Sequence, residues 1–226
     1  MAFTAKDVIS RASIILQDAG AVRWPLPELL TWLNDAAREI AITKPNATAK
    51  TVAMDLVSGT KQEIPATAHS LLQVVRNVDK TTGVGGKVIT PIVRQVLDNQ
   101  IPGWHDGTAL PFSAVVRHVV DDALDQRAFY VVPGNDGTGK IEIVVSSIPA
   151  DIPTPANPLD LGTYSATVDL QEIYRNVVVD YILYRAFSKD MSLPGAAQRA
   201  QAHYTQFNAA LGLKGAGEAI ATTSGQ

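Results

Sequence analysis

Helical sequence patterns lie at both ends of this chain and enclose a long run of short, β-type segments. Near the N-terminus, Val8, Ala12 and Ile15 recur at the spacing of one helical face, and residues 194–212 repeat that spacing near the other end. Between them, runs such as "TVAMDLVSG" and "LLQVVRNVD" are short and bounded by turn-forming residues, which is typical of strands. Because each helical pair presents an apolar face, the economical fold packs the four terminal helices together.

The predicted fold class is therefore α+β, with a four-helix core, an inserted and mostly antiparallel β lobe, and a flexible C-terminal tail. Residues 1–46 and 166–212 form the expected core, residues 47–165 the β-rich lobe with its proline-rich exit, and residues 213–226 the tail. The segment "NVVVDYILYRAF" is apolar nearly all round, as expected of a helix inside a bundle or between a bundle and a partner. The tail sequence has too little apolar surface to fold alone.

The stretch "VVPGNDGTGKIEIVV" resembles a phosphate-binding loop, because Gly134, Gly139 and Lys140 have the spacing G-x-x-x-x-G-K. A working loop also needs Ser or Thr after the lysine and must open a helix. Here Ile141 follows the lysine, and "IEIVVS" favours a strand. We therefore predict a β-hairpin with a long polar loop. A nucleotide-binding enzyme that uses Gly134–Lys140 is the less favoured alternative.

Composition excludes several classes of function. The chain has no cysteine, which removes disulfides, thiolate nucleophiles and cysteine-ligated metals. A net charge of −3 without a basic run argues against a dedicated nucleic-acid binder. The start of the chain lacks a secretory pattern, and Asp180 and Arg185 interrupt its most apolar stretch. We expect a soluble intracellular protein with no membrane partner.

The residues that most often carry chemistry form no catalytic constellation. The four histidines have no metal-ligand spacing; they are His69, His105, His118 and His203. Asp121, Asp122 and Asp125 cluster, but in a turn region such carboxylates usually cap backbone amides. No G-x-S-x-G nucleophile elbow is present. We therefore predict no enzyme, no catalytic residue, no cofactor and no metal site, and a partly buried His203 within the helical bundle.

Several segments resemble a known family when they are taken in order. "WPLPELLTWLNDAAREIAITKP" resembles the second helix of bacteriophage head-to-tail adaptor (connector) proteins. "RAFYVVP", followed by "KIEIVVSSIPADI", is similar to their central hairpin and its proline-rich exit. "VDYILYRAFSKD" and "AAQRAQAHYTQFNAALG" are similar to their paired C-terminal helices. The resemblance covers nearly the whole chain.

This resemblance implies a structural virion protein, made in the host cytoplasm and located in the neck between head and tail. Such adaptors form a ring, twelvefold in characterised cases, that joins the portal protein to a tail or nozzle protein. DNA passes through the lumen without sequence-specific binding. The C-terminal extension of the family docks on the portal, which implies Leu213, Lys214 and Ile220 as portal contacts. A tail-completion or baseplate protein is the alternative within the virion.

Overall fold

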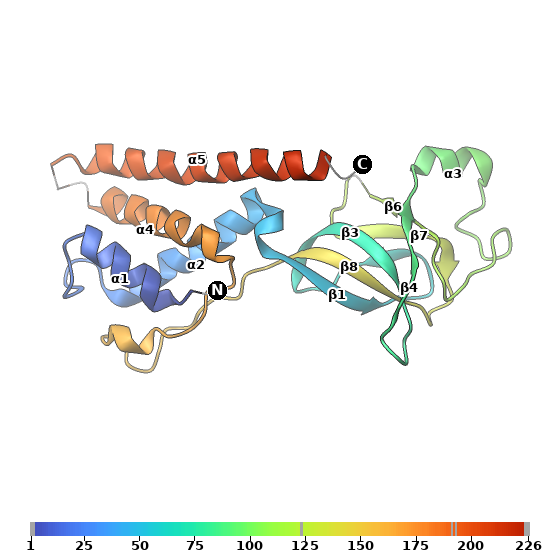
Figure 1. Cartoon of the computed structure of the whole chain (residues 1–226), viewed down its shortest axis with the longest axis horizontal. Helices are drawn as coiled ribbons and strands as arrows, with labels where there is room; N and C mark the ends of the chain where they lie inside the picture. The colour runs from blue at the N-terminus through green and yellow to red at the C-terminus, as the bar shows by residue number, and fades with distance from the viewer. Residues whose placement is uncertain (1–2, 123, 191, 193, 224–226) are drawn as a thin grey trace. The chain divides into compact units, whose positions relative to one another are not determined.

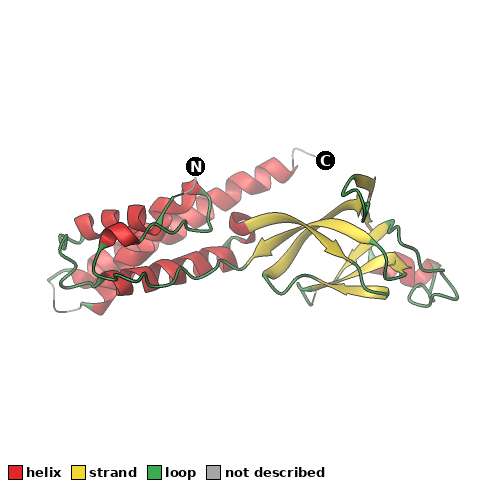
Figure 2. Cartoon of the chain, turned by 90° about the horizontal axis from the view of Figure 1, so that it is seen from below, coloured by secondary structure: helices red, strands yellow, loops and turns green. Residues whose placement is uncertain are grey.

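The computed structural model describes residues 3–122, 124–190, 192 and 194–223, with side chains described as far as Gly212. The chain divides into two compact units (Figure 1). The helical unit comprises residues 1–48 and 149–226, and the β unit comprises residues 49–148. All strands found in the described residues belong to the β unit (Figure 2). The α+β fold class is confirmed.

The described part of the helical unit contains four α-helices and three short 3-10 helices. The α-helices are α1 (Ala5–Ile15), α2 (Leu26–Thr43), α4 (Arg175–Lys189) and α5 (Ala196–Thr223). The 3-10 helices are η1 (Pro45–Thr48), η2 (Leu161–Thr163) and η3 (Glu172–Tyr174). Buried side chains from all four α-helices form one hydrophobic cluster, which confirms that the N- and C-terminal pairs pack together.

Local sequence signals explain the start of α1 and the end of α2. Thr4 and Asp7 form a reciprocal capping box at the start of α1, as the sequence predicts. The α2 helix ends before Pro45, because a proline disfavours helical backbone in the residue that precedes it. The end predicted for the last helix at Gly212 is not observed, since α5 continues to Thr223. An interior glycine costs a helix only about 1 kcal/mol, so one glycine need not stop it.

The proline-rich exit belongs to the helical unit rather than to the β lobe, in which the sequence analysis places residues 47–165. Two interactions explain this difference. The side chain of Asn34 on α2 donates to the carbonyl of Ile152 at 3.0 Å and accepts from its N–H at 3.1 Å. Tyr164 is almost fully buried in the helical core. The exit segment is therefore part of the helical packing.

Eight strands and one short helix lie among the described residues of the β unit. Its strands are β1 (Ala49–Asp55), β2 (Gly59–Glu63), β3 (Ala68–Val78), β4 (Gly85–Val88), β5 (Thr90–Pro91), β6 (His118–Asp121), β7 (Ala128–Asn135) and β8 (Lys140–Ser147). The helix is α3 (Arg94–Gln100). The strands form two four-stranded sheets, in the orders β1-β8-β3-β4 and β2-β7-β6-β5. All pairings are antiparallel except that of β5 with β6.

The hairpin predicted for Val131–Val145 is wrong, because β7 and β8 belong to different sheets. Hydrogen bonds of the Asn135 side chain hold the connection between these two strands. Its amide oxygen accepts from the N–H groups of Gly137 and Gly139, at 2.8 and 3.1 Å. Its amide nitrogen donates to the carbonyl of Ser113 at 2.9 Å. Asn135 thus directs the chain from one sheet into the other, and buried side chains of both strands meet in one core.

Candidate interaction surfaces

The outward face of α5 carries almost no charge over the part of the helix whose side chains the structure describes, Ala196 to Gly212. Between Ala196 and Gly212, where every side chain is described, the exposed residues are Ala197, Gln198, Arg199, Gln201, Ala202, Tyr204, Thr205, Gln206, Asn208, Ala209 and Gly212. Arg199 is the only one of them with a formal charge, and its guanidinium lies 5.6 Å from the ring centre of Phe187. Depletion of charge distinguishes the centre of a protein–protein interface from ordinary surface. This face of α5 is therefore suited to contact with another protein.

The predicted portal contacts lie beyond that face. The backbone of α5 carries Leu213, Lys214 and Ile220, but their side chains lie outside the described residues. Leu211, just before them, is 1% exposed and belongs to the helical core. The role of the three residues in portal binding stays a prediction.

The link between α1 and α2 forms a second exposed surface on the helical unit. Asp18 accepts hydrogen bonds from the N–H groups of Val22, Arg23 and Trp24, at 2.9 to 3.0 Å. Partial burial opposes ionisation of Asp18, but these three hydrogen bonds outweigh it and hold the pKa of its carboxyl below the usual value. Val22, within this turn, is 86% exposed, and Ile14, near the end of α1, is 69% exposed. Apolar side chains thus point to solvent at this end of the unit.

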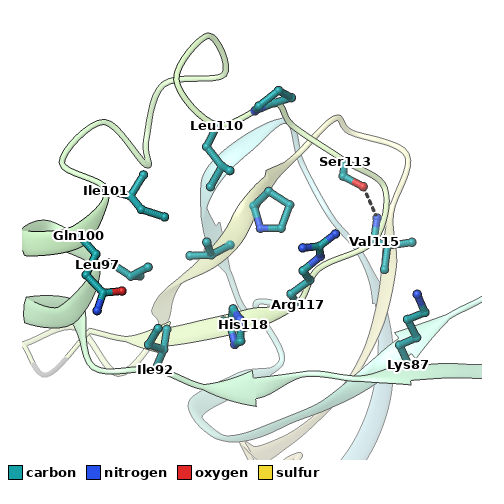
Figure 3. Close-up of a pocket in the computed structure, with 13 residues that line it drawn as sticks. Lys87, Ile92, Leu97, Gln100, Ile101, Leu110, Ser113, Val115, Arg117 and His118 are labelled. Carbon is teal, nitrogen blue, oxygen red and sulfur yellow. Dashed lines mark hydrogen bonds between the residues drawn. The ribbon is translucent and has the colours of Figure 1, made fainter.

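The β unit contains a cleft between α3, the β6–β7 pair and the loop that precedes β6 (Figure 3). We call it the α3 cleft; its volume is about 490 Å³. Leu97 and Val132 are almost fully buried in its wall, and Leu110 and Ile92 extend the apolar surface. Figure 3 shows Lys87, Arg117, His118 and Gln100 around this apolar centre.

Charge in the α3 cleft has one sign. Lys87 and Arg117 are exposed and lie in its lining, and no Asp or Glu is among the described residues that line it. Neither cation forms an ion pair within the described part of the chain. His118 shares a hydrogen bond with Thr90, at 2.8 Å from Nδ1 to Oγ1. The cleft therefore combines an apolar centre with unpaired positive charge.

Packing beneath α3 fixes the shape of the cleft. Trp104 is fully buried and donates from Nε1 to the Asp98 carboxylate on α3, at 2.9 Å. The ring of His105 lies 3.6 Å from that of Trp104, and burial lowers the pKa of His105. Arg94, at the start of α3, lies over the ring of Tyr130 on β7 at 5.4 Å. These contacts tie α3 to the sheet, so the cleft is formed before any partner binds.

Two of the three clustered carboxylates, those of Asp122 and Asp125, cap backbone N–H groups of a turn, as the sequence predicts. It lies in the connection from β6 to β7, where Asp122 accepts from the N–H of Leu124 and Asp125 from the N–H of Arg127, at 3.0 and 2.9 Å. The side chain of Leu124 is 97% exposed. Asp122, Leu124 and Asp125 are called the Leu124 turn below. The guanidinium of Arg127 donates to main-chain carbonyls instead of these carboxylates.

The phosphate-loop spacing has a packing explanation. A Cβ atom on Gly134 would lie 2.5 Å from the Phe112 ring, and one on Gly139 would overlap the Asn135 side chain. Lys140 opens strand β8, so the loop lacks the helix N-terminus that binds phosphate. Hydrogen bonds from Thr138 lower the pKa of Asp136 within the same loop. Both glycines are thus required by close neighbours in the β unit.

The histidines lie apart from one another. His203 is partly buried in the helical unit, as predicted, where Nδ1 lies 3.0 Å from the Asp180 carboxylate and the ring stacks on Phe187. Among the described residues, no group of three or more His, Asp or Glu side chains could hold a metal ion. None of the helices in the described residues has the length and hydropathy of a membrane span.

Sequence reasoning missed the α3 cleft and the exposed leucine. Lys87, Leu97 and Arg117 come from three separate segments, so only the fold brings them together. The Leu124 turn carried a local signal, since "DDALDQ" sets one large apolar residue among three carboxylates. A single exposed leucine is common on protein surfaces, so this signal gains meaning only together with the carboxylates on either side of it.

Comparison with known families supports the resemblance found in the sequence. The model of a family described as SU10 adaptor protein matches residues 3–225, which include both units. A comparison with curated proteins finds no significant match. The family match covers nearly the whole chain. The chain belongs to the SU10 adaptor protein family and is a structural adaptor protein of bacteriophage virions.

Proposed function

We propose that this protein forms a ring in the neck of the virion, where it joins the portal to a tail or nozzle protein and lets DNA pass through its lumen. The observation that carries this proposal is the family match over residues 3–225, since it spans the helical unit and the β unit together. A structural role of this kind uses no bound cofactor and no catalytic residue.

Contacts between copies are supported by the nearly uncharged outward face of α5. A soluble monomer normally covers a helix with charge, whereas the α5 face offers amides, alanines and a Tyr204 side chain that is 41% exposed. Tyrosine is enriched at interface centres, where its ring supplies contact area at small entropic cost. We expect α5 to lie in the ring wall, and the expected ring is a dodecamer.

Portal binding is assigned to the end of the chain. The described helical core includes Leu211 near its end, so the residues that follow are not needed to bury it. The sequence of this segment has two apolar residues, Leu213 and Ile220, and the charged Lys214. We expect these residues to contact the portal. The net charge of −3 fits a lumen that DNA crosses without being held.

Electron microscopy of the full chain mixed with the portal assembly of its phage tests the proposal. We expect a ring stacked on the portal. Leu213→Asp combined with Ile220→Asp should remove that density, whereas Glu39→Gln on an exposed position of α2 should leave it unchanged. The wild-type protein bound instead to isolated tails or baseplates would contradict the proposal and favour the alternative virion role.

A further inference from the structure

We infer that neighbouring copies of this chain join through their β units, with the Leu124 turn of one copy inserted into the α3 cleft of the next. This inference deepens the proposed ring and rests on it, because it names one contact between ring neighbours. It commits the cleft to a second copy of this chain rather than to another virion protein.

The first observation is complementary charge. The α3 cleft carries Lys87 and Arg117 without an acidic residue among its described lining. The Leu124 turn carries Asp122 and Asp125, with Asp121 beside them at the end of β6, and no ion pair satisfies these three carboxylates in the described residues. Opposite potentials on two surfaces speed encounter and fix the orientation of binding.

The second observation is the fit between apolar groups. Leu124 is 97% exposed and is flanked by the two turn carboxylates. The cleft offers the reverse arrangement, with Leu97 and Val132 at its apolar centre and cations beside them. A volume of about 490 Å³ can accept a leucine side chain together with its neighbouring carboxylates. Burial of the Leu124 side chain would stabilise the contact, and the charges of the aspartates would orient the turn in the cleft.

The third observation is geometry. Both surfaces lie on the β6–β7 pair, but at opposite ends of it. His118, which lines the cleft, pairs with Val132, whereas Asp121, beside the Leu124 turn, pairs with Phe129. Three residue steps along β6 separate the ends by roughly 10 Å. A copy cannot place its own turn in its own cleft, and a contact between two different patches of identical copies is head-to-tail, as a ring requires.

Charge-reversed full-length chains test the contact by sedimentation velocity. Lys87→Glu with Arg117→Glu reverses the cleft, and Asp122→Lys with Asp125→Lys reverses the turn. Each variant alone meets like charge at every contact, so we expect it to stay monomeric where the wild type associates. An equimolar mixture can alternate the two variants with opposite charges at every contact, and it should recover association. Leu124→Ala should weaken association roughly tenfold to a hundredfold.

All of these substitutions lie at the surface, and equal melting temperatures would show that each variant folds. If the double cleft variant does not fold, Lys87→Glu alone replaces it. The inference is overturned if the wild type stays monomeric at every concentration, if either reversed variant associates like the wild type, or if the mixture fails to recover.

Disulfide trapping supplies an independent readout, because the chain has no cysteine of its own. Gln126→Cys beside the turn, combined with Gln100→Cys at the cleft, should give a ladder of cross-linked oligomers on oxidation. Gln126→Cys with Val57→Cys, whose side chain is exposed and outside the cleft lining, serves as the control. If the Gln126→Cys, Gln100→Cys variant cross-links no more than this control, the inference is overturned. Portal binding without the cross-link contradicts the contact between copies but leaves the proposed function standing. The cross-link without portal binding supports the contact between copies but contradicts the proposed portal binding.

Discussion

Lys189, the last residue of α4, donates from Nζ to both carboxylate oxygens of Glu28 in the first turn of α2, at 2.6 and 2.8 Å. The two residues are 161 positions apart, and the whole β unit lies between them in the sequence. The helical unit is thus closed by segments from both ends of the chain. Because the Lys189 side chain is 55% exposed, this ion pair contributes little to the stability of the helical unit, although it shows that the two ends of the chain meet there.

The buried core should carry the stability that the ion pair does not. Ile182 on α4 is fully buried among residues of the other helices. We expect Ile182→Ala to lower the free energy of unfolding by about 2 to 5 kcal/mol. Lys189→Ala should lower it by less than about 1 kcal/mol. Urea unfolding of both variants measures the contrast, and equal losses would contradict a helical unit held by its core.

Most of the fold could be predicted because its signals are local. The spacing of Val8 and Ala12, both buried on α1, and the capping box of Thr4 with Asp7 act within one or two helical turns, whereas Ile15, predicted on the same face, is 44% exposed. The pairing of β7 could not be predicted in this way. It depends on Asn135 and its contact with Ser113, which lies on a separate loop. Two β-type runs around a polar turn look alike whether they pair with each other or with other strands.

Asp18 should stabilise the helical unit in a pH-dependent way. We expect Asp18→Asn to cost about 1 to 2 kcal/mol at neutral pH, because a neutral amide accepts the backbone hydrogen bonds less strongly than a carboxylate. The folded pKa of Asp18 lies below its ordinary value of 3.8. The stabilisation is therefore complete above about pH 4 and is lost as the pH falls through the folded pKa.

Thermal unfolding of the wild type and the variant from pH 2 to pH 7 measures this difference. Glu39→Gln, at an exposed position on α2, is the control and should follow the wild type throughout. A constant difference between wild type and Asp18→Asn down to pH 2 would contradict the assigned hydrogen bonds.

We expect the loop between β7 and β8 to be sensitive to added side-chain volume and to bind no nucleotide. We expect Gly139→Ala to destabilise the protein by about 1 to 3 kcal/mol, because its Cβ would overlap Asn135 and Ala114. Lys140→Ala should change stability little. Isothermal titration of the wild type with ATP and GTP should give no heat of binding. Measurable affinity that disappears in Lys140→Ala would revive the nucleotide-binding alternative.

Removal of the residues after Gly212 should separate folding from assembly. Phe207 and Leu211 remain in the shortened chain and complete the described core. We expect the truncated protein to keep the melting temperature of the full chain within a few degrees and to lose binding to portal rings. Co-sedimentation with portal measures the second effect. Retained portal binding would defeat the assignment of Leu213, Lys214 and Ile220.

The candidate surfaces were harder to predict than the fold. A catalytic site is recognised by rare residue types at fixed spacing, whereas an interaction surface is made of common residues that the fold exposes. Leu124 differs from a core leucine in its 97% exposure, and Arg117 is distinguished by its place in the lining of the cleft. The exposure of Leu124 and the surroundings of Arg117 both depend on the three-dimensional fold, so neither can be predicted from the sequence.

The most direct test of the account is a cryo-electron microscopy reconstruction of the neck of the assembled virion. We expect a ring of this chain between the portal and the tail, with α5 in the ring wall, the residues after Gly212 against the portal, and an open lumen. Density for the chain only at the baseplate, or only within the tail, would contradict it.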